Sequence, residues 1–155
     1  MNKEKGFTLI ELLAVIVILG VIMLIAIPMV TSYIENAKKD AFLDNARMAI
    51  RQARNDMISQ DAGSCEFPAV GGEAVLATSA MNFEKEFTSP YTGEEMTQSY
   101  VRITSPSEGK YEYEYWGMDD EGNGLTNWLD EDSLKREEVK KKGGVSRYSG
   151  KGCNE

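Results

Sequence analysis

One acidic residue, Glu11, lies inside an otherwise apolar stretch near the N-terminus. Residues 12–30 contain no charged side chain, and residues 7–10 extend the apolar run with Thr8 as their one polar member. An unpaired carboxylate costs up to about 3 kcal/mol in a lone membrane helix. Because a simple anchor gains nothing from that cost, the position of Glu11 indicates a function and predicts a partner for its charge.

The other residue types give little support to catalysis. The chain contains no histidine, which excludes a Ser-His or Cys-His pair and removes the commonest transition-metal ligand. The sequence also shows no nucleotide-binding loop and no metal-binding cluster. We therefore expect a protein that is not an enzyme and that holds no cofactor.

One acidic loop deserves comparison with calcium sites. Residues 119–124 combine acids and glycines and begin with Asp119, Asp120 and Glu121. Calcium prefers such oxygen ligands, but the order of the residues does not match an EF-hand loop. A solvated turn explains the same residues, so these three acids are only weak calcium candidates and the predicted metal content is none.

The composition divides the chain into two parts that suit different solvents. The 155 residues have a mean hydropathy of -0.37 although the early stretch is almost wholly apolar, so the rest must be strongly polar. This length accommodates one membrane-anchored element and one small globular head. The formal net charge of -8 would repel nucleic acid phosphates, so nucleic acid is not an expected partner.

The apolar run is long enough to cross a bilayer as a helix. Lys3 and Lys5 precede it, which under the positive-inside rule places the N-terminus in the cytoplasm and the chain after about Ser32 outside. The simplest alternative is an ordinary signal anchor or signal peptide. Against it, residues 26–29 match a small-x-small cleavage site poorly, and a helical pattern continues beyond the run.

Residues 5–16, KGFTLIELLAVI, closely resemble the processing and assembly motif shared by type IV pilins, type II secretion pseudopilins and competence pseudopilins. The resemblance implies that prepilin peptidase cuts between Gly6 and Phe7 and that Phe7 becomes N-methylated. A glycine at the cut suits a protease that must approach the backbone closely. The resemblance also implies a partner for Glu11, namely the Phe7 amine of a neighbouring subunit during assembly.

Beyond the apolar run the pattern is that of an amphipathic helix. Apolar residues recur mostly three and four positions apart from Ile34 to Ile58, and charged residues fill the other side. We predict one continuous helix from about Thr8 to about Gln60, ended by Gly63. Its hydrophobic half is expected to pack in the core of a filament and its amphipathic half against a sheet.

Gly20 and Pro28 are the weak points of this helix. Glycine lowers helix propensity, and proline removes the hydrogen bond back to Leu24 and crowds that turn. The resemblance implies that the helix can melt between such positions in a filament, and a simple bend is the open alternative. The predicted organisation is a leader at residues 1–6, a transmembrane and filament-core helix at 7–30, its amphipathic continuation at 31–62 and a head at 63–155.

The head has the pattern of a small antiparallel sheet. Residues 99–104 and 110–116 flank a turn at 105–109 and predict a hairpin in which Arg102 lies opposite Glu112. In that register the residues on one face would cover the helix, although a tyrosine-rich strand could also form a sugar-binding surface. The shared face would hold Val101, Ile103, Tyr111, Tyr113 and Tyr115.

The remaining elements of the head follow weaker patterns. We expect a short helix at residues 74–87, for which an irregular loop is the alternative, a second helix at 133–142 with Asp132 or Ser133 as its cap, and a last strand near 145–149. The predicted fold class is therefore α+β and pilin-like, with a long N-terminal helix packed on a small antiparallel head sheet.

Cys65 and Cys153 are the two cysteines of the chain. Outside the cytoplasm such a pair is more often bonded than not, so we expect a disulfide that staples the tail to the end of the helix. In the chain-entropy model a bridge across so long a loop contributes about 4 to 5 kcal/mol. Two cysteines without histidine make a zinc site a poor alternative.

Charge is distributed unevenly along the head. Residues 61–132 hold sixteen acids against three basic residues, whereas residues 135–155 hold seven basic residues against three acids. Simple solvation is the first interpretation, docking between adjacent heads the second and contact of the basic tail with DNA the third.

The sequence thus predicts a structural subunit of a type IV pilus that assembles with itself and with other pilins. Its further partners would be prepilin peptidase, the cytoplasmic membrane before assembly and the pilus assembly platform, and its final location an extracellular filament. The alternatives are a pseudopilin of a type II secretion or competence system and a minor tip pilin that acts as an adhesin. Exposed head tyrosines, or a solvent-facing Trp116 or Trp128, would favour the adhesin.

Overall fold

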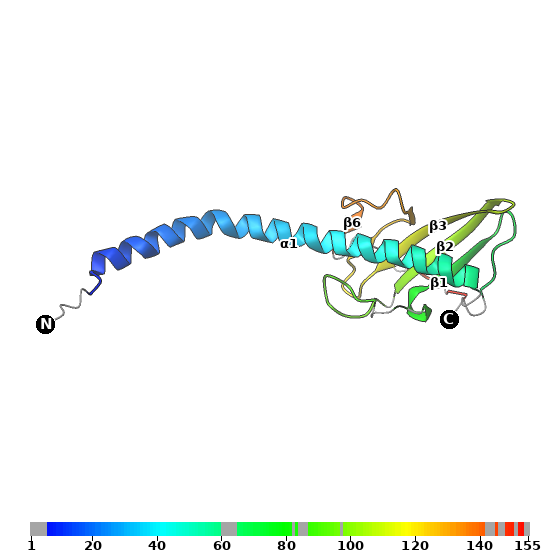
Figure 1. Ribbon diagram of the computed structural model, residues 1–155, viewed down its shortest axis with the longest axis horizontal. Helices are drawn as coiled ribbons and strands as arrows, with labels where there is room; N and C mark the ends of the chain where they lie inside the picture. Colours follow the sequence, from blue (N-terminus) through cyan, green and yellow to red (C-terminus); the bar gives the residue numbers. More distant parts are fainter. Residues whose placement is uncertain are drawn as a thin grey trace. The chain divides into compact units, whose positions relative to one another are not determined.

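The computed structural model describes residues 6–59, 65–81, 83, 87–96, 98–141, 145, 148–150 and 152–153 (Figure 1). Contacts divide the chain into two units, Met1–Ala37 and Lys38–Glu155, and the long helix runs through both. The elements in chain order are α1 (Leu9–Ser59), β1 (Glu73–Ala77), η1 (Thr78–Ala80), β2 (Gln98–Ser107), β3 (Lys110–Met118), β4 (Gly124–Leu125), β5 (Leu129–Asp130) and β6 (Val139–Lys140).

The long helix confirms the prediction to within a residue at each end. Helix α1 continues without a break through Gly20 and Pro28. Gln60 and Gly63, which were expected at its end, lie outside the described residues.

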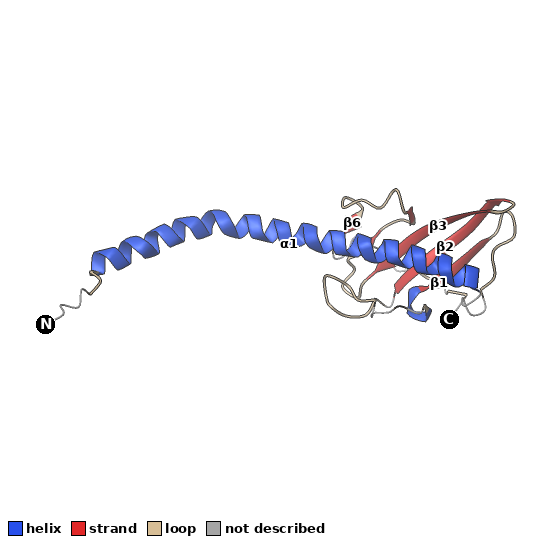
Figure 2. Cartoon of the chain, viewed as in Figure 1, coloured by secondary structure: helices blue, strands red, loops and turns tan. Residues whose placement is uncertain are grey.

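In the second unit, α1 lies across one face of the sheet (Figure 2). The helix buries a stripe of side chains whose spacing of three and four residues keeps them on one side. On the sheet, the side chains that pack against this stripe include Leu76, Val101, Ile103 and Tyr115, each of which has no exposed surface. The buried residues of α1 are Phe42, Leu43, Ala46, Ala49, Ile50, Ala53, Asp56 and Met57.

The sheet is antiparallel and has six strands. Its strand order is β1-β2-β3-β4-β6. Strand β5 is not part of this order and pairs with β3. Paired residues share a face, so the rows Leu76–Val101–Tyr115 and Ala74–Ile103–Tyr113 face the helix. This arrangement confirms an α+β, pilin-like fold class.

The predicted hairpin forms, but its register is displaced by two residues. Arg102 lies opposite Glu114, not Glu112. The strands continue to a tight turn at Glu108–Gly109, where Gly109 adopts a positive φ of 71°. An irregularity between Thr104 and Ser107 places an extra residue on β2. A displacement of two residues preserves the alternation of faces, so the predicted face towards the helix is correct.

Neither of the two predicted short helices is an α-helix in the described residues. Residues 73–77 form β1, which pairs along its whole length with β2, and the 3-10 helix η1 follows. Residues 133–142 contain turns and then β6, in which Val139 pairs with Leu125. The pairing of each segment with a strand outweighs its local helix propensity.

The predicted last strand is not found at residues 145, 148 and 149, which form no regular element. Residues 146 and 147 of that prediction lie outside the described residues. Residue 142 of the second predicted helix, and residues 82 and 84–86 of the first, also lie outside them.

The burial of α1 predicts a strong contrast between two isoleucines on the same helix. Ile50 has no exposed surface, whereas Ile58 is 69 % exposed. We expect Ile50→Ala to lower the free energy of unfolding by about 2 to 5 kcal/mol, because it leaves a cavity under the sheet. Ile58→Ala should stay within about 0.5 kcal/mol of the parent. Urea denaturation of the purified chain in detergent tests the contrast, and equal losses would contradict this packing.

Candidate processing and assembly site

The first turn of α1 is closed by its own side chains. The N–H of Thr8 and the hydroxyl of Thr8 both donate to Oε2 of Glu11, each at 2.8 Å. The N–H of Glu11 in turn is 3.3 Å from Oγ1 of Thr8. This reciprocal arrangement is a capping box, which satisfies backbone N–H groups that otherwise have no partner at a helix start.

The capping box was missed in the sequence analysis, although its pattern was present. Thr8-x-x-Glu11 directly before an apolar run is the usual sequence sign of such a helix start. Glu11 therefore has a role within its own chain, in addition to the partner that its apolar setting predicted.

The apolar half of α1 is uncovered. From Phe7 to Ile34 every large apolar side chain is at least 47 % exposed, and Phe7 itself is 90 % exposed. Full burial of one such side chain is worth about 1.5 to 3 kcal/mol, so contact of the whole run with water would cost tens of kcal/mol. In the described part of the chain, α1 is the one helix long and apolar enough to cross a membrane.

The residues predicted for cleavage and assembly lie near one another at the N-terminal end of the chain. Phe7 and Glu11 line one shallow depression with Leu12, Val15 and Ile16. Gly6 has open space around it, because a side chain at this position would meet no other atom within 4 Å. The bond that follows Gly6 is thus next to the start of a capped helix, and Glu11 lies in that helix's first turn.

A pilin-like architecture is therefore combined with an uncovered apolar helix that carries an acidic residue in its first turn. Residues 1–27 match the family model described as the prokaryotic N-terminal methylation motif. That motif is the signature of type IV prepilin-like proteins, and it implies processing by prepilin peptidase and assembly with other pilins. It points to a structural protein rather than to an enzyme. No solved structure matches the chain.

At the other end of the chain, the predicted disulfide is present. Cys65 and Cys153 are bonded, with their Cα atoms 5.4 Å apart and a sequence separation of 88. The N–H of Cys153 also donates to the carbonyl oxygen of Val75 at 2.7 Å, which attaches the tail to the outer edge of β1.

The acidic loop is organised by Asp119, which is buried. Its carboxylate accepts hydrogen bonds from the Ser89 hydroxyl at 2.7 Å, from the N–H of Asn123 at 2.8 Å and from the Asn123 side-chain amide. A carboxylate surrounded by donors is a poor cation ligand. Asp120 and Glu121 are exposed. Among the described residues, no group of three or more potential ligands could hold a metal ion.

The tyrosines of β3 pack towards the helix. Tyr115 is fully buried and accepts a hydrogen bond from the Ser99 hydroxyl at 2.9 Å, and its burial raises the pKa of its own hydroxyl. Tyr113 is half-buried beneath the Arg54 guanidinium, 5.0 Å from the ring centre. Trp116 is also buried. These residues are therefore largely part of the head's packing.

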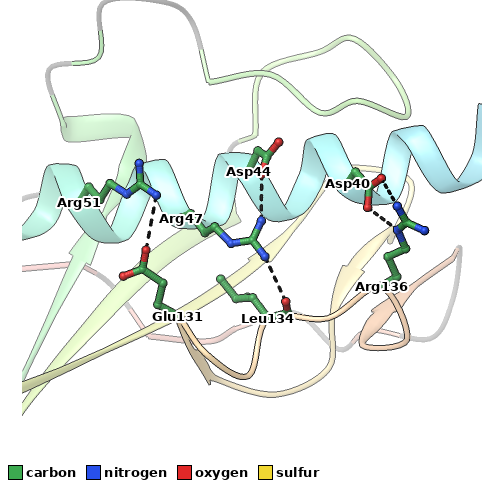
Figure 3. A network of polar contacts seen from close by, with 7 residues as sticks. All are labelled: Asp40, Asp44, Arg47, Arg51, Glu131, Leu134 and Arg136. Atoms are coloured by element: carbon green, nitrogen blue, oxygen red, sulfur yellow. Dashed lines mark hydrogen bonds and ion pairs between the residues drawn. The ribbon is translucent and has the colours of Figure 1, made fainter.

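A charged network holds the segment after β5 against α1 (Figure 3). The guanidinium of Arg136 donates to the carboxylate of Asp40, and this contact holds the pKa of Asp40 below its usual range. Arg47 donates to the carbonyl oxygen of Leu134 at 3.3 Å. Exposed pairs contribute little individually, but together they fix where the segment lies. The other pairs are Arg47–Asp44, Arg51–Glu131 and Arg54–Glu131.

Proposed function

We propose that the chain is a structural subunit of a type IV pilus. The observation that carries the proposal is Glu11, a carboxylate in the first turn of an uncovered apolar helix, five residues after Gly6. In this proposal prepilin peptidase cuts between Gly6 and Phe7, and Phe7 is then N-methylated. The subunit waits in the cytoplasmic membrane with its N-terminus on the cytoplasmic side and passes from there into an extracellular filament through the pilus assembly platform.

The assembly step follows from the geometry of the first helical turn. Cleavage leaves a cationic amine on Phe7, and the two Thr8 contacts both use Oε2 of Glu11. The lone pairs of Oε1 then suit the amine of a neighbouring subunit. In an apolar filament core such a pair is strongly favoured, because either charge alone is costly there. The exposed apolar side chains would be covered by the helices of the neighbours.

Gly20 and Pro28, the two weak points of α1, are also expected to take part in assembly. Pro28 lacks an N–H, so the carbonyl of Leu24 loses its helical donor. The hydroxyl of Thr31 donates back to the carbonyl of Pro28 at 3.0 Å, and side-chain bonds of this kind often bend helices. We propose that the segment between Gly20 and Pro28 melts when the subunit enters a filament.

The finer alternatives differ in what the head does. A pseudopilin of a type II secretion or competence system would share the whole N-terminal site, so the place of the filament distinguishes it. A tip adhesin needs exposed recognition groups, and the burial of Tyr115 and Trp116 supports a structural subunit over that alternative. Docking between the unlike charged parts of adjacent heads stays a prediction.

Cleavage is tested by the size of the residue at position 6. Gly6→Leu should leave a full-length precursor in the membrane and none of the chain in sheared surface filaments, because a branched side chain keeps the protease from the backbone. Gly6→Ala is the matched control and should still be cut in part. Normal filaments from Gly6→Leu would contradict the proposal, and a cleaved wild-type chain found only within the envelope would favour a pseudopilin.

A further inference from the structure

The sheet has a second apolar face, on the side away from α1. Its strands direct Ala77, Tyr100 and Trp116 outward in one row, and Met118 lies on the same face two residues further along β3. We call these four residues the outer aromatic face. All four are buried, with Trp116 only 4 % exposed, although α1 covers the opposite side of the sheet.

Part of the cover comes from Val145 and Tyr148, near the C-terminus. The ring of Tyr148 lies 5.0 Å from Tyr100 and 5.9 Å from Trp116, measured between ring centres. It also meets Trp128 edge-on at 5.4 Å. Val145 packs against the same cluster. Aromatic rings at such distances contribute packing as well as area, so Tyr148 is the central anchor of this segment.

The same segment is fastened a second time at the edge of the sheet. Gly150 leaves room for the ring of Tyr148, because any side chain there would collide with it. Three residues further on, Cys153 bonds to Cys65 and its N–H donates to Val75. The segment therefore has one anchor that depends on packing and one that depends on the oxidation state of two sulfurs.

We infer that Val145, Tyr148 and Cys153 belong to a C-terminal strap that the Cys65–Cys153 disulfide locks over the outer aromatic face and that a dithiol reductant releases. In the release step a thiolate of the reductant attacks one sulfur of the disulfide and displaces the other. The second thiol of the reductant then attacks the reductant's own sulfur in the mixed disulfide and releases the remaining protein cysteine as a thiolate. Cys65 and Cys153 end as two thiols, and the dithiol ends as a cyclic disulfide.

This device has a consequence that is independent of the proposed filament. A head whose cysteines have not yet been joined would show a contiguous aromatic surface, and exposed apolar patches promote association with other proteins. Oxidation outside the cytoplasm would hide that surface. The exposure of the outer aromatic face would thus distinguish a head whose disulfide has formed from one whose cysteines are still free thiols.

Tryptophan fluorescence of the full-length chain in detergent tests the strap, with Trp128→Phe as the background so that Trp116 is the reporter. On reduction with dithiothreitol, the acrylamide quenching constant should rise at least about twofold, because the cover over the ring is gone. The Cys65→Ser/Cys153→Ser chain should show the higher value without reductant. Circular dichroism should show that the sheet and α1 persist in both cases.

Tyr148→Ala tests the packing anchor with the disulfide intact. It should raise the quenching constant, whereas Tyr33→Ala is the control, because Tyr33 is 76 % exposed in the apolar half of α1. Quenching that is unchanged on reduction would overturn the inference. Loss of all regular structure on reduction would also overturn it, since the disulfide would then hold the whole head and not a strap.

Discussion

Glu11→Gln is expected to reduce incorporation of the chain into filaments at least about 100-fold and to leave cleavage after Gly6 intact. Glutamine keeps an oxygen that can accept the Thr8 hydrogen bonds, so the capping box can survive. It removes the negative charge, however, and leaves the Phe7 amine of the next subunit unpaired in an apolar core. Removal of one partner of a buried pair costs about 3 to 5 kcal/mol.

The matched variants separate pairing from capping. Glu11→Ala removes both functions and should also be cleaved but not assembled. The amount of chain in sheared filaments, relative to the amount of cleaved chain in the membrane, is the measurement. If Glu11→Gln assembled normally while Glu11→Ala did not, the role of Glu11 would be the helix cap alone, and the pairing mechanism would be wrong.

Removal of the Cys65–Cys153 bridge should lower the free energy of unfolding by about 4 to 5 kcal/mol in the chain-entropy model. The bond closes a loop across 88 residues of sequence separation, so its loss frees most of the head in the unfolded state. Urea denaturation of the Cys65→Ser/Cys153→Ser chain in detergent gives the change.

Two controls make this measurement specific to the disulfide. The wild-type chain in dithiothreitol should match the double variant, and dithiothreitol should leave the double variant unchanged. A loss below about 1 kcal/mol would mean that the strap is held by packing alone, since even a much shorter loop should contribute about 3 kcal/mol.

The parts of the fold that could be predicted from the sequence are those in which apolar residues recur with a regular spacing. The spacing of three and four residues from Phe42 to Met57 identified the buried side of α1, and the alternation along β2 and β3 identified the face that covers it. Leu43 is buried although it directly follows Phe42 and so breaks this spacing, and Ile58, the last apolar residue of the predicted pattern, is exposed. Both lie at the borders of the stripe, where periodicity is least decisive.

The register of the hairpin could not be predicted, because it depends on one backbone irregularity. A regular ladder across a five-residue turn would have placed Arg102 opposite Glu112. The bulge before Ser107 and the tight turn at Gly109 move the partner to Glu114. Glu114 then forms an ion pair with Arg102 at 2.6 Å, which alternation alone does not specify.

The two wrong helices have a common cause. In the described residues 133–141 the buried positions are Leu134 and Val139, five residues apart, which fits no single side of a helix. Their composition favours a helix, but contact with other strands decides their structure. Residues 74–77 form a short apolar run without a clear period, and only the partner strand β2 shows that they extend.

The N-terminal motif was predictable because it is contiguous in sequence. Gly6, Phe7 and Glu11 lie within six residues, and the motif that contains them is matched over residues 1–27. The strap was not predictable, because it joins Tyr148 to Tyr100 and Trp116 across distant parts of the chain. The role of Asp119 was missed for the same reason, since its buried partner Ser89 lies thirty residues away.

The most direct test of the central claim is the intact mass and N-terminal sequence of the chain sheared from the cell surface. The proposed function predicts a chain that begins at Phe7, carries one additional methyl group on its amine and is recovered in filaments. It also predicts a mass two hydrogens below that of the reduced chain, because Cys65 and Cys153 are joined. A chain that begins at Met1, or one cut after the apolar run, would contradict the pilin mechanism.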